Sequence, residues 1–541
     1  MARKKQISYI NGRLSGNYLN QDTCNKLESL RRLDEKKGYV KELKHIIFDL
    51  PMSDVEVIKQ AKSSDWFDLK DKHGTLENIQ TVGVAYMYFA KRLILGDSVG
   101  LGKTVEVAGL CNLLENNAYK EGRDFRFLFL TNKTLIPQVR DELIKFTGNY
   151  VEAVYGEKAK VQKFIDENTL ELKYSVVGVH SLFKSKDFQE YLRGFVVDTG
   201  QIPFDLLVVD ESGDILANHK SQMYSEASYV ASMFERVVLL NATPFEKNLL
   251  MFYNQLDFID PTFLPTRTYF SSEFEVMDYS GPYPMPSGKY KNAEKFKNLI
   301  GYRYLSRSRK SSGGTMIGCS AEAITVPLSK AQRMLLEKTA IPRMVYDCPS
   351  YFNMGVKTNL STTPKLKALV DLLKGDLKDV GSILIYTWYR ESQDVIKSIL
   401  DMYDFGTIAI LNGGSSDKER ERVINEFKLG TTRILITNVQ KGLNFGNCNH
   451  CVFYSYDSSP SRMVQFEGRM TRSLHIVNKH VYVLLSNGDE KKSFFSIVSD
   501  RAKASDMFAG SDFSCILSLL TGDSTHVDIV SDEVSSGVML D

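Results

Sequence analysis

The stretch Gly96-Asp97-Ser98-Val99-Gly100-Leu101-Gly102-Lys103-Thr104 decides the fold of the first half of this chain. It follows the apolar run 93–95 and leads into residues 105–110, which have helical character. A glycine-rich loop between a strand and a helix turns backbone N–H groups and the helix N-terminus toward one point, where phosphate can bind. Lys103 would reach the terminal phosphate and Thr104 would face Mg²⁺. The stretch therefore predicts an α/β domain that uses ATP.

The loop departs from the general phosphate-loop pattern at one position. That pattern places a glycine six residues before the lysine, and this chain has Asp97 there. A surface turn with a chance Gly-Lys-Thr is therefore the alternative, and the remainder of the chain has to decide between the two interpretations.

Length and composition indicate a multidomain intracellular protein. The chain has 541 residues, of which 43% are hydrophobic and 25% are charged, and such a length favours roughly three to four structural units. No apolar run approaches the roughly 18 residues of a membrane span, and the basic start has no apolar core behind it. Seven scattered cysteines fit a reducing compartment. We expect no contact with a membrane.

Cys448 and Cys451 have the spacing of half a zinc site or a redox pair. No second pair of this kind follows, and the apolar residues after Cys451 favour the start of a buried strand. The formal net charge is only +2, so contact with nucleic acid would have to come from a local patch.

Short apolar runs alternate with helical segments in two separate parts of the chain. Such a pattern is typical of parallel sheets covered by helices on both faces. The runs of the first part are 93–95, 127–130, 176–179, 206–209 and 237–240, and those of the second part are 383–386, 408–411, 434–436, 452–454 and 481–485. We therefore expect two parallel-sheet α/β lobes in tandem.

The same pattern predicts the limits of the domains. They are a small N-terminal accessory domain at 1–74, a first lobe at 75–265, an interlobe region at 266–355, a second lobe at 356–505 and a C-terminal tail at 506–541. Residues 279–286, rich in Tyr, Gly, Pro and Ser, are expected to form a loop. The acidic end from residue 523 onward is expected to be a solvated, mobile tail. The alternative is that its negative charge screens a nucleic-acid site.

Two predicted strands of the first lobe end in residues suited to phosphate chemistry. Asp210 and Glu211 follow the run 206–209, so Asp210 would hold Mg²⁺ and Glu211 would orient or deprotonate the attacking water. Asn241-Ala242-Thr243-Pro244 follows the run 237–240 and is suited to sensing the γ-phosphate. A solvated turn and a proline turn are the respective alternatives.

In the second lobe, the segment 465–472 contains two arginines with helical spacing. Arg469 and Arg472 would share one face of a helix or turn, and arginine stabilises charge on a transferred phosphoryl group. An exposed basic helix is the alternative. We expect both arginines to join Lys103, Asp210 and Glu211 as catalytic residues.

Together these motifs resemble the superfamily-two nucleic-acid-dependent ATPases, in particular their Swi/Snf-type double-stranded DNA translocase branch. The resemblance runs from about residue 75 to 495 and rests also on the extension 241–261 and on the basic segment 307–310. Asp97 at the first glycine position of the loop is typical of that branch. Gln80 resembles the glutamine that recognises the adenine base. The resemblance implies two RecA-like lobes and a nucleotide site made by Gln80, Asp97, Gly100, Gly102, Lys103, Thr104 and Gln465, with Thr104 and Asp210 as ligands of Mg²⁺.

The resemblance further implies DNA as a partner, duplex or branched, contacted through its backbone, so that binding should weaken steeply with salt. The residues in the segments that line the nucleic-acid track are Lys133, His180, Ser181, Thr243, Trp388, Thr437 and Asn444. For His180 and Trp388 a structural role in the core is the alternative.

Two departures from the family pattern stand out. Ser212-Gly213 replaces an alanine-histidine pair after the two carboxylates, and Gln440-Lys441 stands where small residues are common.

The resulting hypothesis is an ATP-dependent DNA motor in repair, recombination, replication or transcription, with the compact chain favouring a bacterium or a phage-infected host over a nucleus. A strand-separating helicase or branch-migration enzyme for forks or junctions is one alternative. An ATP-switched scaffold that recruits polymerase or chromatin through residues 1–74 is the other. Sequence leaves the oligomeric state open.

Overall fold

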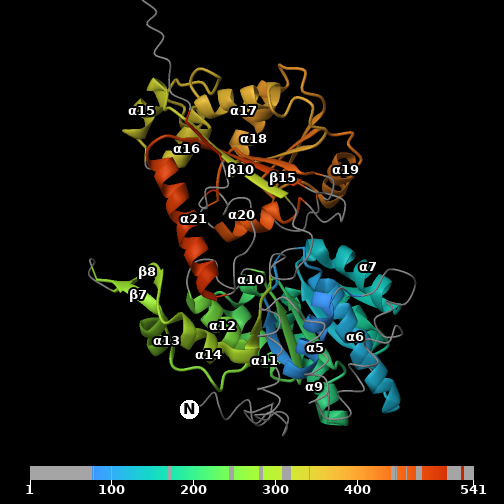
Figure 1. The fold of residues 1–541 in the computed structure, drawn as a ribbon. Coiled ribbons are helices and arrows are strands. Elements are labelled where there is room, and N and C mark those ends of the chain that lie inside the picture. The colour runs from blue at the N-terminus through green and yellow to red at the C-terminus, as the bar shows by residue number, and fades with distance from the viewer. Residues whose placement is uncertain are drawn as a thin grey trace, which may run out of the picture. The chain divides into compact units, whose positions relative to one another are not determined.

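The computed structural model describes two compact units of the chain, divided near residue 315. The described residues are 76, 78–98, 100–168, 172–200, 202–242, 249–279, 284–307, 318–339, 341–439, 445, 448–457, 460–470, 478–508, 519 and 525–528. The predicted accessory domain at 1–74 lies outside them. Each unit is built around one parallel sheet with helices on both faces (Figure 1), which confirms the predicted α/β fold with two RecA-like lobes.

The first unit contains a seven-stranded sheet in the order β3-β4-β2-β5-β6-β1-β9, and all of its strand pairs are parallel. Every predicted apolar run of this part forms a strand. Two further strands, β3 and β9, lie at the edges of the sheet. The strands are β1 Arg92–Leu95, β2 Phe127–Thr131, β3 Val151–Val154, β4 Ser175–Val179, β5 Leu206–Asp210, β6 Arg236–Leu240 and β9 Tyr304–Leu305.

Neighbouring residues of each strand point to opposite faces of this sheet and so enter two different cores. In β1, Leu93 and Leu95 contact the core of the first face, whereas Ile94 contacts the core of the second. The first face is covered by α5 Asn78–Ala90, α6 Lys103–Lys120 and α7 Ile136–Thr147. The second is covered by α8 Lys158–Glu167, α9 Lys186–Thr199, α10 Ser212–Leu216, α11 Gln222–Ala231, α12 Leu249–Ile259, α13 Arg267–Phe274 and α14 Ala293–Ile300.

The second unit contains another seven-stranded parallel sheet, in the order β12-β13-β11-β14-β15-β10-β16. Its strands are β10 Gly318–Val326, β11 Ile383–Tyr386, β12 Ile408–Leu411, β13 Ile434–Thr437, β14 His450–Phe453, β15 Asn478–Ser486 and β16 Thr525–Asp528. All five predicted runs of this part form strands.

Helices again cover both faces of the second sheet (Figure 1). One face carries α17 Pro364–Lys374 and α18 Arg390–Leu400, and the other carries α19 Asp417–Lys428, α20 Pro460–Glu467 and α21 Asp489–Phe508. The shorter α15 Lys330–Leu336 and α16 Pro342–Asp347 precede α17. The remaining short 3-10 helices are η1 Lys133–Leu135, η2 His180–Lys184, η3 Gly301–Arg303 and η4 Pro349–Phe352.

The structure divides the expected interlobe region at 266–355 between the two units. Its first part belongs to the first unit, because Phe270, Phe274 and Phe296 are buried in the second-face core and β9 pairs with β1. Its later part belongs to the second unit, because β10 pairs with β15 over nine residues. Aromatic burial and strand pairing thus divide this segment between the units.

Two smaller expectations also need correction. The predicted loop 279–286 ends inside a strand, since β8 Met285–Tyr290 pairs antiparallel with β7 Glu275–Asp278. This two-stranded ribbon has a register irregularity after Val276, which accommodates Pro286 as edge strands can. The acidic tail is not solvated throughout, because its β16 pairs with residues 322–325 of β10.

Candidate nucleotide site

The strands β5, β6 and β1 are neighbours in the first sheet, and their carboxyl ends bring the candidate nucleotide residues to one edge. Leu95 lies opposite Leu240, and Asp210 lies opposite Leu240 from the other side. The glycine loop begins after β1, Asp210 and Glu211 lie at the end of β5, and Asn241 follows β6. All three groups therefore lie at the same level of the sheet. Ligands of parallel α/β sheets bind at this kind of edge.

Two glycines shape the loop after β1. Gly100 has φ of 85° and Gly102 has φ of 86°, which is the left-handed region that side chains with a Cβ rarely adopt. A Cβ on Gly102 would also lie 2.5 Å from Nε2 of Gln80. That amide donates a hydrogen bond to the carbonyl of Leu101 (3.1 Å), so Gln80 lies against the loop.

Lys103 begins helix α6, and its ammonium lies among carboxylates. Nζ donates to the carbonyl oxygens of Asp97 (2.6 Å) and Ser98 (3.3 Å). Burial lowers the pKa of Lys103, and the charges of Asp97, Glu211 and Asp210 act against this shift. Asp210 and Glu211, the two predicted carboxylates, thus favour the charged form of the predicted lysine. Thr104, the next residue of α6, is half-buried.

Asp97 has a side-chain partner that the sequence did not indicate. Its carboxylate is fully buried and accepts from Nε of Arg307 at 3.1 Å to each oxygen. Nη2 of Arg307 also contacts both carboxylate oxygens of Glu106, each at 2.9 Å. Asp97, Glu106 and Arg307, here named the loop ion cluster, explain why an acid replaces the usual glycine. The Asp97 carboxylate thus contacts Arg307.

The segment before residue 308 runs alongside the nucleotide loop. The N–H of Gly96 donates to the carbonyl of Leu305 (2.7 Å), and that of Ser98 donates to the carbonyl of Arg307 (2.9 Å). The hydroxyl of Ser306 returns a bond to the carbonyl of Gly96 (3.0 Å). The expected domain limits place Arg307 in the interlobe region, and the structure places it in the first unit.

The two carboxylates after β5 have different environments. Oδ2 of Asp210 accepts from the hydroxyl of Thr131 (3.0 Å) at the end of neighbouring β2. Glu211 has φ of 49° and ψ of 44°, a left-handed conformation that is uncommon for a residue other than glycine. Such conformations persist only where the surroundings hold them, and they cluster at functional sites.

His180 contacts the same strand end from the first residue of η2. Its Nε2 lies 2.8 Å from the carbonyl oxygen of Asp210. The ring is 5% exposed, and burial lowers its pKa below the ordinary value of 6.5. The structural reading of His180 is therefore favoured over contact with nucleic acid.

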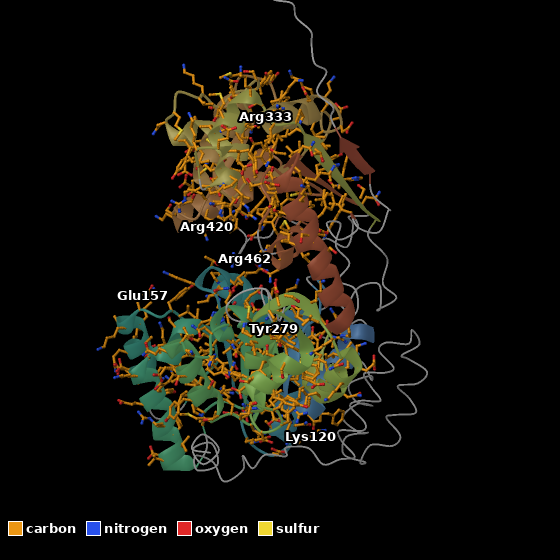
Figure 2. The ribbon with its side chains drawn as sticks, turned by 90° about the vertical axis from the view of Figure 1, so that its left-hand side faces the viewer. Lys120, Glu157, Tyr279, Arg333, Arg420 and Arg462 are labelled. Atoms are coloured by element: carbon orange, nitrogen blue, oxygen red, sulfur yellow. The ribbon has the colours of Figure 1, made fainter. Side chains whose placement is uncertain are left out.

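Other predicted nucleic-acid residues of the first unit lie after the carboxyl ends of β2 and β4. Lys133 is exposed and its Nζ lies 3.3 Å from Oε1 of Glu157, a residue at the surface of this unit (Figure 2). Ser181 is also exposed. Thr243 lies outside the described residues.

The predicted residues of the second unit are mostly buried. Arg469 follows α20 and is 4% exposed, so the alternative of an exposed basic helix does not hold for it. Gln465 within α20 is buried as well. Thr437 is buried at the end of β13, where its hydroxyl accepts from the N–H of Val439 (2.9 Å). Half-buried Trp388 contacts the core, and Asn444 and Arg472 lie outside the described residues.

The zinc alternative for the cysteine pair fails. Cys448 and Cys451 are both buried, and Cys451 lies within β14 as predicted. Burial raises the pKa of Cys448 to about 12 and raises that of Cys451 as well. Within the described ranges, no cluster of three or more metal-binding side chains occurs.

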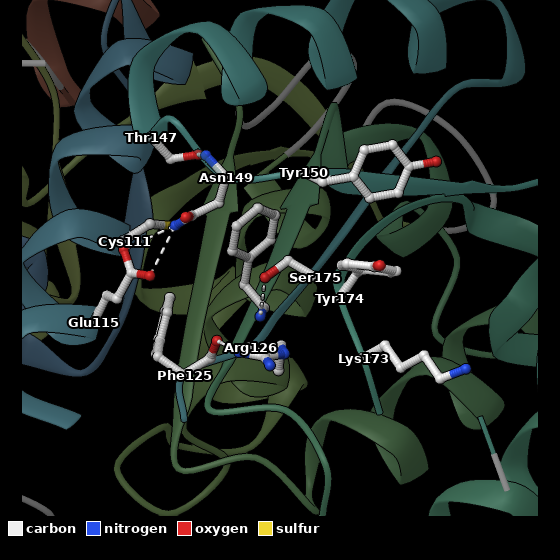
Figure 3. A pocket seen from close by; sticks show the side chains of 11 residues that line it. Cys111, Glu115, Phe125, Arg126, Thr147, Asn149, Tyr150, Lys173, Tyr174 and Ser175 are labelled. Atoms are coloured by element: carbon white, nitrogen blue, oxygen red, sulfur yellow. Dashed lines mark hydrogen bonds between the residues drawn. The ribbon is translucent and has the colours of Figure 1, made fainter. Parts of the chain in front are cut away.

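A pocket of about 190 Å³ opens at the opposite edge of the first sheet, where β2 and β4 begin (Figure 3). Glu115 spans part of its wall and accepts from Nδ2 of Asn149 at 2.8 and 2.9 Å. Its lining includes none of the predicted site residues.

In the part of the chain that the structure covers, no helix has the length and apolar character to cross a membrane.

Two protein families match the chain in succession. The SNF2-related domain matches residues 79–369, and the helicase conserved C-terminal domain matches residues 364–473.

Curated relatives show the same likeness at low identity. The chain is 22% identical over 466 residues to Protein CHROMATIN REMODELING 4 of Arabidopsis thaliana, covering 77% of this chain and 20% of the relative. It is 22% identical over 473 residues to DNA repair and recombination protein RAD54B of Mus musculus, covering 74% and 52%. With the uncharacterized ATP-dependent helicase YqhH of Bacillus subtilis it shares 24% over 437 residues, covering 72% and 71%. The chain thus spans a fifth and about half of the first two relatives.

A solved structure resembles the chain over most of its length. This is the Sulfolobus solfataricus SWI2/SNF2 ATPase core in complex with dsDNA, with 17% identity, a TM-score of 0.37, and coverage of 83% of this chain and 94% of that one. The family matches, which reach more than half of the residues, carry the assignment. The chain belongs to the SNF2-related family and consists, from residue 79 to 473, of an SNF2-related domain followed by a helicase conserved C-terminal domain.

Proposed function

We propose that this protein is an ATP-dependent DNA motor that hydrolyses ATP on its first unit and moves along double-stranded DNA. One observation carries the proposal: the glycine loop with Lys103 follows β1, and Asp210 and Glu211 lie at the end of β5, at the same edge of the sheet. These are the residue types that phosphoryl transfer from ATP requires, and they occur in a chain of the SNF2-related family.

In this proposal, each site residue of the first unit has a separate role in binding or hydrolysing ATP. The loop from Gly100 to Thr104 cradles the phosphates with its backbone N–H groups, and Gln80 beside the loop contacts the base. Thr104 and Asp210 offer the hard oxygen ligands that Mg²⁺ prefers. This small donor set fits Mg²⁺, which takes one or two protein oxygens and completes its shell with phosphates and water. Mg²⁺ would neutralise charge on the phosphates, and Glu211 would orient the attacking water.

The second unit supplies positive charge in this proposal. Arg469 and Arg472 act on the transferred phosphoryl group, and Gln465 assists in binding the nucleotide. Arginine suits this role because its planar guanidinium stays charged and forms two parallel hydrogen bonds to phosphate. ATP binding and hydrolysis would then alternately join and release the two lobes, which converts the reaction into movement.

Duplex DNA is the proposed track. The Sulfolobus core is described in complex with dsDNA, and exposed Lys133 and Ser181 are the first-unit residues available for contact with a phosphate backbone. Thr243, Thr437 and Asn444 are further proposed contacts. RAD54B is named for DNA repair and recombination, so we place the motor in DNA repair, recombination or a related process inside the cell. The match with the Bacillus protein over most of both chains supports a bacterial or phage setting.

Steady-state ATP hydrolysis tests this proposal across a panel of nucleic acids. We expect duplex DNA to raise the rate, and single-stranded DNA or RNA of the same length to raise it less. Lys103→Ala should be inactive with every substrate, because it removes the charge that binds the terminal phosphate. Stimulation by RNA equal to that by duplex would overturn the assignment of duplex DNA as the track. Unstimulated hydrolysis by an otherwise active protein would favour the scaffold alternative.

A further inference from the structure

Helix α10 follows directly after Glu211. Side chains of α12 form hydrogen bonds at both ends of α10. At the start of α10, the hydroxyl of Ser212 donates to Oε1 of Gln255 (2.9 Å). At its end, the carbonyl of Ala217 accepts from Nδ2 of Asn254 (2.7 Å). A helix of five residues is too short to be stable by itself. Two consecutive amides of α12 therefore set the position of the segment that begins next to Glu211.

Gln255 also contacts the end of the neighbouring strand. Its Oε1 accepts a second hydrogen bond, from Nδ2 of Asn241 (2.8 Å), and its Nε2 donates to the carbonyl of Met251 (3.2 Å). Ser212 and Gln255 are fully buried, and Asn241 is 3% exposed. One buried amide, satisfied on both sides, thus connects the end of β5 with the end of β6.

The unusual Ser212-Gly213 pair makes this network possible. Ser212 supplies the hydroxyl that Gln255 binds. At Gly213, a Cβ would lie 2.6 Å from Nδ2 of Asn241, so a larger residue would displace the asparagine. The departure from the family pattern after Glu211 therefore coincides with a hydrogen-bond network that needs these two residues.

We propose that Gln255 is a positioning residue for Glu211. The inference rests on the proposed function, in which Glu211 orients the attacking water. The left-handed backbone of Glu211 needs support from its surroundings, and the residue after it is held by Gln255. Without that bond, Glu211 shifts relative to the phosphate loop. Gln255 bonds to Ser212, Asn241 and Met251, which lie outside the glycine loop, so we expect nucleotide binding to be retained.

The test compares kcat and KM for ATP, with saturating duplex DNA, in Gln255→Leu and in the wild type. Gln255→Leu keeps the volume and removes both acceptor bonds. A misplacement of about 1 Å can cost about 100-fold in rate, so we expect kcat to fall roughly 10- to 100-fold while KM stays within a factor of about two. Gln255→Glu retains an acceptor oxygen and should recover part of the rate. Ser212→Ala, which removes a single bond, should lower kcat in the same direction but by less.

Asn112→Leu is the matched control. Asn112 is a buried amide of α6 in the same unit, and its Nδ2 donates to the carbonyl of Phe146 (3.1 Å). This variant should lose stability and retain kcat. Equal kcat losses in Gln255→Leu and Asn112→Leu, or a wild-type kcat in both Gln255→Leu and Ser212→Ala, would overturn the positioning role. Glu211→Gln in the same assay separates the two hypotheses, because full activity of that variant contradicts the proposed function itself.

Discussion

Replacing Glu211 by glutamine is expected to lower steady-state ATP hydrolysis by roughly 10²- to 10⁴-fold, the range for a general base. The carboxylate lies near the ammonium of Lys103, on the strand end where an attacking water would be held. Glutamine keeps the size of the side chain and removes its ability to take a proton. ATP binding should remain, since the glycine loop and Lys103 are unchanged.

Phosphate release under saturating ATP and duplex DNA measures this effect, and a fluorescent ATP analogue measures binding in the same preparation. Glu190→Gln serves as the control, because Glu190 is an exposed residue of α9 outside the site. Hydrolysis by Glu211→Gln at the rate of Glu190→Gln would remove Glu211 from the mechanism.

Replacing Arg307 by methionine is expected to reduce the local stability of the first unit by about 3–5 kcal/mol. In the loop ion cluster, the Arg307 guanidinium contacts the fully buried carboxylates of Asp97 and Glu106. Methionine has similar length and no charge, so two carboxylates would remain buried without their cation. Breaking one side of a buried ion pair is costly because the remaining charge stays away from water.

Hydrogen exchange of the amides in α6 measures this loss, since the slowest amides report the opening of the surrounding structure. Arg123→Met is the control, because Arg123 is about half exposed and pairs with Glu121 and Asp205 at the surface. Such surface pairs contribute only about 0–1 kcal/mol. A loss for Arg307→Met as small as that for Arg123→Met would show that the cluster does not stabilise the loop.

Most of the strands that sequence predicted correctly are buried on both faces, and the edge strand β12, with two half-buried residues at its centre, is an exception whose residues are still all apolar. A run such as 206–209 is apolar throughout because helices cover both sides of the sheet, and that signal needs no partner to be recognised. Two edge strands of the first sheet lack it: Glu152 interrupts the apolar residues of β3, and β9 has two residues only. For β16, the acidic composition of the tail concealed a pairing that depends on distant β10.

The residues of the candidate site fall into two groups: those in short local motifs and those brought to them by the fold. Lys103, Asp210 and Glu211 belong to short motifs whose chemistry is local, so the sequence alone was enough to propose them. The partners of these motifs come from far along the chain: Arg307 is 210 positions from Asp97, and Gln255 is 43 from Ser212. No spacing rule connects such residues. The Ser212-Gly213 departure was the one sign of the second network, and its meaning needed the fold.

Displacement of a third strand from a DNA triplex distinguishes movement along duplex DNA from strand separation, because a protein that moves along intact duplex removes the third strand without separating the duplex. The account predicts ATP-dependent displacement by the wild type, none by Lys103→Ala, and no unwinding of a forked duplex of equal length. Unwinding of the fork without displacement of the third strand, or displacement that needs no ATP, would contradict it.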